Sequence, residues 1–168
     1  MKKKEFCKLK VHTYICIVKL EEALKTDKFS SQNQKAGLNI LYTAWWLKTI
    51  ISAEMKPIGI THEQYNVLRI LKGKHPQQMC VRDIGSRMIE RNSNVPRIID
   101  RLVAKNLVNR STSDIDKRET VISLTTSGID ILRSATLKMN TLLKNLVTVD
   151  EEDSKKLNSL LEKYREKE

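Results

Sequence analysis

The segment from about Ser93 to Asn106 constrains the fold most, because it divides into an apolar face and a cationic face. At about 100° per residue, counted from Asn94, the apolar side chains fall between roughly 40° and 180°. Asn94, Arg97 and Arg101 fall between about −60° and 0°, and Lys105 lies close by at about 20°. We therefore predict a helix that packs on a core along one side and presents cations and amides on the adjoining side. The apolar residues are Val95, Ile98, Ile99, Leu102 and Val103.

Pro96 limits where this helix can begin. Proline has no backbone N–H, so it is tolerated in the first turn of a helix, where that N–H would have no intrahelical partner. We therefore expect the N-cap at Ser93 or Asn94. A start much earlier would place the proline in the helix interior.

Two further helices are predicted ahead of this segment. Thr61 and Gln64 have the spacing of a capping box, which predicts a helix start and a helix reaching about Lys72, with Tyr65, Leu68 and Leu71 facing inward. The run VRDIGSRMIE follows and predicts a short third helix, after which RNSN turns the chain. Its apolar face is expected to consist of Val81, Ile84, Met88 and Ile89.

A charged hairpin is predicted after the cationic helix. One strand is expected near 107–111 and another over 119–124, where Thr120, Ile122 and Leu124 alternate with Val121 and Ser123. The tip between them carries Asp114, Asp116, Lys117 and Arg118. Two short helices, a turn and a hairpin in this order predict a winged helix-turn-helix lobe over residues 60–127. Its second helix could enter a DNA major groove, and the tip could reach phosphates or the minor groove.

The charge distribution favours a polyanionic partner. The 168 residues carry a formal net charge of +11, and residues 69–118 hold twelve Lys or Arg against five Asp or Glu, a net charge of +7. Such an excess of cations attracts nucleic acid. The cations are most concentrated where the predicted helix and hairpin lie.

Helices are also expected on both sides of the lobe, so the predicted fold class is mainly α with a small β-hairpin wing. A helix over about 5–25 lies in an N-terminal extension (1–30), and further helices occupy 31–56 and 129–168, all within a single domain. Thr148 and Glu151 have capping-box spacing, with Asp150 to Asp153 where a helix N-terminus favours acids. The last helix must bury an apolar stripe, and a second subunit is a candidate partner. That stripe consists of Leu157, Leu160, Leu161 and Tyr164.

Residues 35–165 resemble the MarR family of bacterial transcription regulators, named for multiple antibiotic resistance. The most specific part is the D-x-R signature of the wing, here Asp116-Lys117-Arg118, followed by L-T-x-x-G, here Leu124-Thr125…Gly128. Two positions depart from the family pattern. Pro96 stands where relatives commonly have a small hydroxyl residue, and Gly85 stands where alanine is usual, which lowers local stability.

The resemblance implies a homodimer that binds double-stranded DNA at a pseudo-palindromic operator, with 31–56 and 129–168 as dimerisation helices. It also implies repression relieved by a small aromatic or phenolic effector. Arg118 would enter the minor groove, with Lys117 beside it and Asp116 bracing the wing. Tyr42, Trp45 and Trp46 are candidates for an effector pocket, although their spacing fits core and dimer packing equally well. The DNA-contacting residues implied around the helix are Asn92, Ser93, Asn94, Pro96, Arg97 and Arg101.

Other function classes find little support. The sequence contains no Gly-rich phosphate loop, paired-carboxylate motif, metalloprotease signature or nucleophile elbow, so we expect no enzyme and no cofactor. Cys7, His12 and Cys16 do not converge on one helix face, so no metal site is predicted, and Cys80 is expected to be a small buried residue. The cysteine pattern and the lack of a membrane-spanning stretch suggest a cytoplasmic protein that does not enter membranes.

Two alternative functions remain open at this point. A non-specific architectural nucleic-acid binder could use the same basic patch without any effector. A protein-interaction adaptor could keep the fold and lose DNA binding, although the retained Arg97, Arg101 and Arg118 argue against it.

Overall fold

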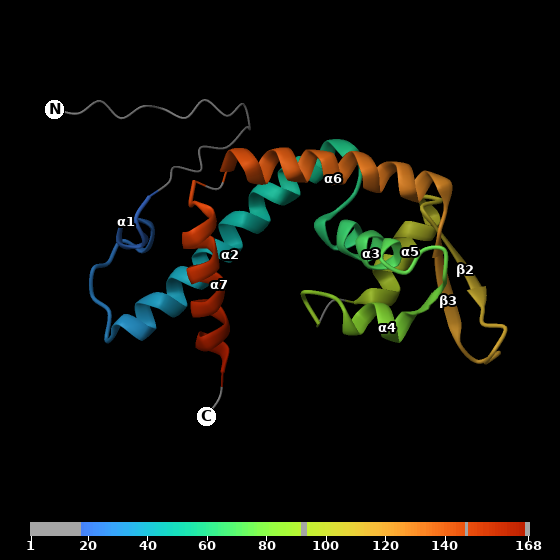
Figure 1. Ribbon diagram of the computed structural model, residues 1–168, viewed down its shortest axis with the longest axis horizontal. Coiled ribbons are helices and arrows are strands. Elements are labelled where there is room, and N and C mark those ends of the chain that lie inside the picture. The colour runs from blue at the N-terminus through green and yellow to red at the C-terminus, as the bar shows by residue number, and fades with distance from the viewer. Residues whose placement is uncertain (1–17, 92–93, 147, 167–168) are drawn as a thin grey trace.

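The chain is mainly helical with a small antiparallel sheet, which confirms the predicted fold class (Figure 1). The computed structural model describes residues 18–91, 94–146 and 148–166. Its helices and strands, in chain order, are α1 (Leu20–Leu24), α2 (Gln32–Met55), the 3-10 turn η1 (Lys56–Ile58), α3 (His62–Lys72), β1 (Met79–Cys80), α4 (Val81–Ser86), α5 (Val95–Ala104), β2 (Val108–Thr112), β3 (Thr120–Leu124), α6 (Thr126–Leu146) and α7 (Glu151–Arg165).

The three longest helices, α2, α6 and α7, extend away from a compact lobe. Figure 1 shows α3, α4, α5 and the strands gathered at one end, with α6 running from the sheet back to α2 and α7. The core of the lobe is completed by α2 and α6, since Met55 and Ala135 are fully buried within the same apolar cluster. The lobe, α2 and α6 therefore share one continuous core. Its fully buried members from the lobe include Val67, Leu68, Ile84, Ile99, Leu102 and Ile122.

The sheet has three strands in the order β1-β3-β2, one more than the predicted hairpin. In β1, Met79 pairs with Ile122 and Cys80 pairs with Val121. A two-residue strand has no periodicity to detect, and it exists only because β3 offers it a paired edge. As the central strand, β3 buries Val121 as well as Ile122, so the expected inward-outward alternation does not hold at Val121.

The predicted capping box at the start of α3 is confirmed. The Thr61 hydroxyl accepts from the Gln64 N–H at 3.2 Å, and Gln64 Oε1 accepts from the Thr61 N–H at 3.1 Å. Gln64 is buried, and its Oε1 also accepts from Lys105 Nζ at 3.0 Å. Lys105 Nζ further donates to the Gly59 carbonyl at 2.6 Å. Lys105 therefore joins the end of α5 to the start of α3, and its ammonium group, although Lys105 is exposed, is engaged within the protein.

The helix predicted over VRDIGSRMIE is shorter than expected. α4 ends at Ser86, whose hydroxyl donates to the Asp83 carbonyl at 2.9 Å. Beyond it Met88 is buried as predicted, but Ile89 is 76% exposed. Because the chain leaves the helix before Ile89, helical phase no longer decides which way that side chain points. The prediction that Ile89 faces inward is wrong.

The last helix begins at a different cap from the one predicted. Asp150 is the N-cap of α7, and its Oδ1 accepts from the Asp153 N–H at 2.8 Å. The Thr148–Glu151 capping box is therefore wrong, because the helix starts two residues after the position that this box requires. The expected acids in the first turn are confirmed, where they face the positive end of the helix dipole.

At the N-terminus only part of the predicted helix can be compared. α1 (Leu20–Leu24) falls inside the predicted range, but residues 18–19 are not helical and Lys19 is an N-cap with extended backbone, so the prediction of one continuous helix is wrong there. The part of the range with Cys7, His12 and Cys16 lies outside the described residues. Cys80 is buried, as expected, and its sulfur caps α4 by accepting from the Asp83 N–H at 3.4 Å. Over residues 18–91, 94–146 and 148–166, none of the helices combines the length and apolar character needed to cross a bilayer.

Candidate nucleic-acid interface

The cationic helix begins where Pro96 requires it to begin. α5 starts at Val95 with Asn94 as the N-cap, and Asn94 Oδ1 accepts from the Arg97 N–H at 3.2 Å. Pro96 sits in the first turn of the helix, as predicted. The cap occupies Oδ1 of Asn94 and leaves its amide NH₂ group for another partner. The two other candidates at this end, Asn92 and Ser93, lie outside the described residues.

The two faces of α5 separate as the sequence predicts. Ile99 and Leu102 are fully buried, whereas Pro96, Arg97 and Arg101 are exposed. Within the described part of the chain, none of the ion pairs includes Arg97 or Arg101. These guanidinium groups are therefore presented to solvent with their hydrogen-bonding capacity available.

An acid on the exposed side of α5 is neutralised by the neighbouring strand. Arg110 of β2 pairs with Asp100 of α5 at 2.5 Å between Nη2 and Oδ1. This pair cancels the negative charge of Asp100 on the exposed side of α5, and it ties the strand to the helix. The periodicity of α5 shows Asp100 beside Arg97, but it contains no sign of the partner ten residues along the chain.

The tip of the wing is closed by a residue that sequence reasoning missed. Ser113 is buried, and its hydroxyl accepts from the N–H groups of Ile115 at 3.2 Å and of Asp116 at 3.3 Å. Its own N–H donates to the Glu119 carbonyl at 2.9 Å. Serine hydroxyls commonly organise turns in this way, so the serine three residues before Asp116 was the available signal.

Asp116 and Arg118 are brought together, as their proposed roles require. Asp116 Oδ1 accepts from the Arg118 N–H at 2.9 Å and lies 3.4 Å from its Nε. The side chain of Arg118 is nonetheless 93% exposed. Lys117, also exposed, pairs with Asp114 at 3.4 Å, which gives that acid a partner. The wing therefore presents a guanidinium to solvent from a loop held by the neighbouring carboxylate.

The L-T-x-x-G motif connects the wing to the end of α5. The Thr125 hydroxyl donates to the Asn106 carbonyl at 2.8 Å and accepts from the Gly128 N–H at 2.9 Å. The Thr125 N–H donates to the Leu107 carbonyl at 3.2 Å. Thr125 thus caps α6 and holds the chain that links α5 to β2. The motif sets the position of the hairpin relative to α5.

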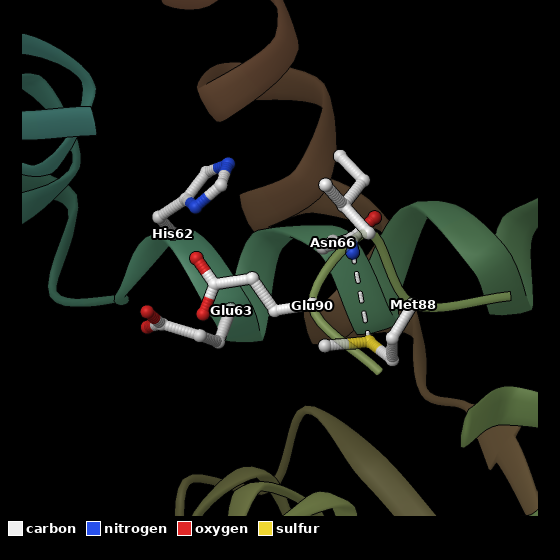
Figure 2. Close-up of a pocket in the computed structure, with 6 residues that line it drawn as sticks. His62, Glu63, Asn66, Met88 and Glu90 are labelled. Atoms are coloured by element: carbon white, nitrogen blue, oxygen red, sulfur yellow. Dashed lines mark hydrogen bonds between the residues drawn. The ribbon is translucent and has the colours of Figure 1, made fainter. Parts of the chain in front are cut away.

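A polar cluster links α2 to the turn before α5. Lys48 Nζ lies 2.6 Å from a Glu90 oxygen and 3.5 Å from a Glu63 oxygen. Figure 2 shows His62 and Glu63, from the first turn of α3, beside Glu90 and a small cavity. The Asn66 amide donates to the Met88 sulfur at 3.5 Å across this cavity (Figure 2). Lys48 therefore bridges the long helix and the lobe.

Within this cluster, the pKa values of Lys48 and Glu63 depart from their ordinary values. The hydrogen bond to Glu90 raises the pKa of Lys48, and the charges of both carboxylates add to this effect. Burial alone would raise the pKa of Glu63. Its backbone hydrogen bond, the Thr61 hydroxyl and the Lys48 charge act in the opposite direction and together lower it. Each charge thus stabilises the other in the folded protein.

The predicted effector residues lie together on α2. The rings of Tyr42 and Trp45 are 5.6 Å apart between centroids, and Trp45 is 57% exposed. Two pockets are formed by the residues that the structure describes between α3 and the turn before α5 and between α2 and α7, and Tyr42, Trp45 and Trp46 line neither of them. The second of these pockets lies between α2 and α7, lined by Asn33, Leu160, Lys163 and Tyr164. The residues that the structure describes contain no group of three His, Cys, Asp or Glu side chains able to hold a metal ion.

Comparison with known proteins finds a family similarity in part of the sequence and a shared fold in the structure. Residues 60–120 match the model of the MarR family. The transcriptional regulator PapX of Escherichia coli is 34% identical over 96 residues, which cover 55% of this chain and 58% of PapX. The chain therefore matches less than two thirds of the length of that relative.

Two solved structures share the fold. One is a MarR-like transcription regulator from Bacillus cereus, with a TM-score of 0.71, 21% identity and coverage of 80% of this chain and 96% of that one. The other is MepR of S. aureus in complex with DNA, with a TM-score of 0.70, 23% identity and coverage of 81% and 96%. Residues 60–120 thus resemble the MarR family in sequence, and the described chain shares the winged helix-turn-helix fold of these two solved structures.

Proposed function

We propose that this protein is a sequence-specific, DNA-binding transcription regulator. The observation that carries the proposal is the set of exposed guanidinium groups, Arg97 and Arg101 on α5 and Arg118 on the wing, within one small lobe. An α-helix fits the DNA major groove, where arginine can donate two hydrogen bonds to the O6 and N7 atoms of guanine. The similar structure of MepR was solved with DNA, which supports the same partner here.

The proposed contacts divide by type. Arg97 and Arg101 would read base edges in the major groove. Lys117 would contact the phosphate backbone, and Arg118 would enter the minor groove while Asp116 keeps the wing in shape. The start of α5 would also lie against DNA, where N–H groups at a helix N-terminus favour phosphates. That part of the proposed surface comprises Asn92, Ser93, Asn94 and Pro96.

The proposal includes a homodimer, formed by the long helices. Single exposed apolar residues are common, but here they are concentrated on α2, α6 and α7 rather than scattered. No residue of α7 is buried, and the Tyr164 hydroxyl donates to the Asn33 carbonyl of α2 at 3.2 Å. A two-fold dimer would bury these side chains and place two recognition helices about one DNA turn apart, roughly 34 Å. The exposed apolar residues are Leu41, Trp45, Leu137, Leu143, Leu157, Leu160 and Tyr164.

We further propose that the protein is a repressor whose DNA binding is relieved by a small aromatic or phenolic ligand. The partly exposed Tyr42, Trp45 and Trp46 support an aromatic ligand, because aromatic walls suit aromatic rings. A ligand would act by selecting a dimer in which the spacing of the two α5 helices does not match the half-sites. Trp45 and Trp46 are the two tryptophans of the chain, so titration with phenolic compounds can be followed by tryptophan fluorescence.

The central test is selection of bound sequences from a random duplex pool, followed by affinity measurements on the selected duplex. A regulator should yield a palindromic consensus and prefer it to random duplex by about 10³ or more. Arg118→Ala is expected to cost about 1 to 3 kcal/mol and to lower the salt slope of binding by about 1. Arg133→Ala is the matched control, because this exposed arginine of α6 pairs with Asp130 and lies outside the proposed surface.

The same test distinguishes the proposed regulator from the alternative, a non-specific architectural nucleic-acid binder. Equal affinity for selected and random duplex, without a consensus, would support a non-specific nucleic-acid binder and overturn the proposed regulator. If a consensus is found but the Arg118→Ala protein binds it as tightly as wild type, the protein is still a sequence-specific regulator, but Arg118 does not contact DNA as proposed.

A further inference from the structure

Ile115 stands at the tip of the wing with its side chain 100% exposed. Among the described residues of the winged lobe, Ile89 and Ile115 are the large apolar side chains that remain exposed. The other exposed apolar residues belong to the segments around the proposed dimer interface. A branched apolar side chain held wholly in water gains no stability from folding. The side chain of Ile115 is therefore free to contact a partner without any loss of packing in the folded monomer.

The backbone around Ile115 is held in one conformation. Its N–H donates to the buried Ser113 hydroxyl at 3.2 Å, and the loop is closed by the bond from the Glu119 N–H to the Asp116 carbonyl at 2.9 Å. The Arg118 N–H donates to the Asp116 carboxylate at 2.9 Å. Ile115 is thus presented by a loop that is already ordered, which lowers the entropy lost when a partner binds.

The tip does not carry a net charge. Asp114 pairs with Lys117 at 3.4 Å, and Asp116 lies 3.4 Å from the Nε of Arg118. Residues 114–118 therefore hold two acids and two bases, so their formal charges cancel. Beyond the individual contacts proposed for Lys117 and Arg118, the tip therefore adds no net charge to the attraction between the lobe and a polyanion. An apolar contact at Ile115 would supply a source of affinity that does not depend on net charge.

We propose that Ile115 packs into the DNA minor groove beside Arg118 and contributes to the choice of A·T pairs under the wing. This inference rests on the proposed DNA-binding function. The minor-groove walls are formed by deoxyribose, which offers apolar surface, and apolar side chains are used in this groove by other DNA-binding proteins. A G·C pair places the guanine N2 amino group on the groove floor. That group would obstruct a branched side chain, whereas an A·T pair leaves the space open.

The test measures affinity for the duplex selected from the random pool, with the wild-type, Ile115→Ala and Ile89→Ala proteins. Ile115→Ala is expected to bind about fivefold to tenfold more weakly, with an unchanged salt slope because no charge is removed. Ile89→Ala is the matched control, since it removes the same exposed side chain elsewhere in the lobe. Both substituted residues are exposed, and equal midpoints in urea unfolding will show that all three proteins are folded alike.

Duplexes with altered base pairs then test whether the guanine N2 amino group in the minor groove obstructs Ile115. In the pairs under the wing, A·T is replaced either by G·C or by hypoxanthine paired with cytosine, which lacks the N2 amino group. Wild-type protein should lose affinity for the G·C duplex and keep more of it for the hypoxanthine duplex, and the difference should shrink in Ile115→Ala. Equal affinity of the Ile115→Ala and wild-type proteins, or equal losses for Ile115→Ala and Ile89→Ala, would overturn the inference but leave a sequence-specific regulator standing. A wild-type protein without any sequence preference would overturn the proposed function itself, and the inference with it.

Discussion

A β-carbon on Gly128 would lie 2.0 Å from the carbonyl oxygen of Leu107, far closer than two such atoms can approach. The last residue of the L-T-x-x-G motif is therefore a glycine for a steric reason. The close approach lets the first turn of α6 lie directly on the chain that leaves α5. The same carbonyl accepts from the Thr125 N–H at 3.2 Å, so the wing and α5 meet at this point.

Gly128→Ala should therefore destabilise the protein strongly. The obstacle is backbone on both sides, so relief requires α6 to move away from Leu107, and we expect a loss of about 2 to 4 kcal/mol. The midpoint of urea unfolding measures this loss. Ser127→Ala, at the exposed neighbouring position of the same helix, should leave the midpoint almost unchanged. A Gly128→Ala protein as stable as wild type would mean that the two segments are not packed this closely.

Gly85→Ala should have the opposite effect. The added β-carbon would lie 3.7 Å from Val95 Cγ2, an ordinary van der Waals contact. Alanine also loses less backbone entropy than glycine on entering a helix, which favours α4 by about 0.5 to 1 kcal/mol. The Tm should rise by about 1 to 4 °C in thermal unfolding. A lower Tm would indicate that α4 and α5 pack more tightly than this distance implies.

Lys105 should matter for stability and not for DNA affinity. Lys105→Met keeps the alkyl chain but removes the donor to the Gly59 carbonyl and Gln64 Oε1, and we expect a loss of about 1 to 2 kcal/mol. Its DNA binding should keep the salt slope of wild type, whereas Arg101→Met should lower that slope by about 1 with little effect on unfolding. If Lys105→Met instead lowers the salt slope and leaves unfolding unchanged, Lys105 belongs to the DNA surface after all.

Acid should weaken the link between α2 and the lobe. The pKa of Glu63 in the folded protein is lowered, despite burial that acts against it, by hydrogen bonds and the Lys48 charge. Its stabilising effect is present above the ordinary carboxyl range near about 4.3 and is lost as the pH falls through the lowered value. Glu63→Gln should therefore flatten the acid side of a plot of urea midpoint against pH.

The matched control for this acid effect is Glu166→Gln, an exposed glutamate at the end of α7. It should retain the steep acid side of the wild-type curve. Curves of equal steepness for wild-type and Glu63→Gln proteins would argue that the Lys48 cluster contributes nothing to acid stability. The effect should also be smaller at high salt, because both side chains of the pair are partly exposed.

Much of the lobe is predictable from the sequence because its signals are local. The Thr61–Gln64 capping box, the apolar face of α5 and the limit imposed by Pro96 each depend on residues within one or two helical turns. Helical and strand periodicities of 3.6 and 2 residues express such short-range relations directly. The charged wing tip was also visible, since Asp116 and Arg118 are neighbours in the chain and interact as neighbours.

Only the tertiary structure decided which distant groups would meet. Strand β1 exists through its pairing with β3, some forty residues later in the chain. Lys105 is held within the protein by the Gly59 carbonyl, which lies within its reach, and Lys48 meets Glu90 across 42 residues. A lysine or a two-residue segment has several possible partners, and its own sequence does not rank them. The sequence by itself thus determined the helices and the wing, while long-range packing determined which charges remain free to face a partner and which become part of the fold.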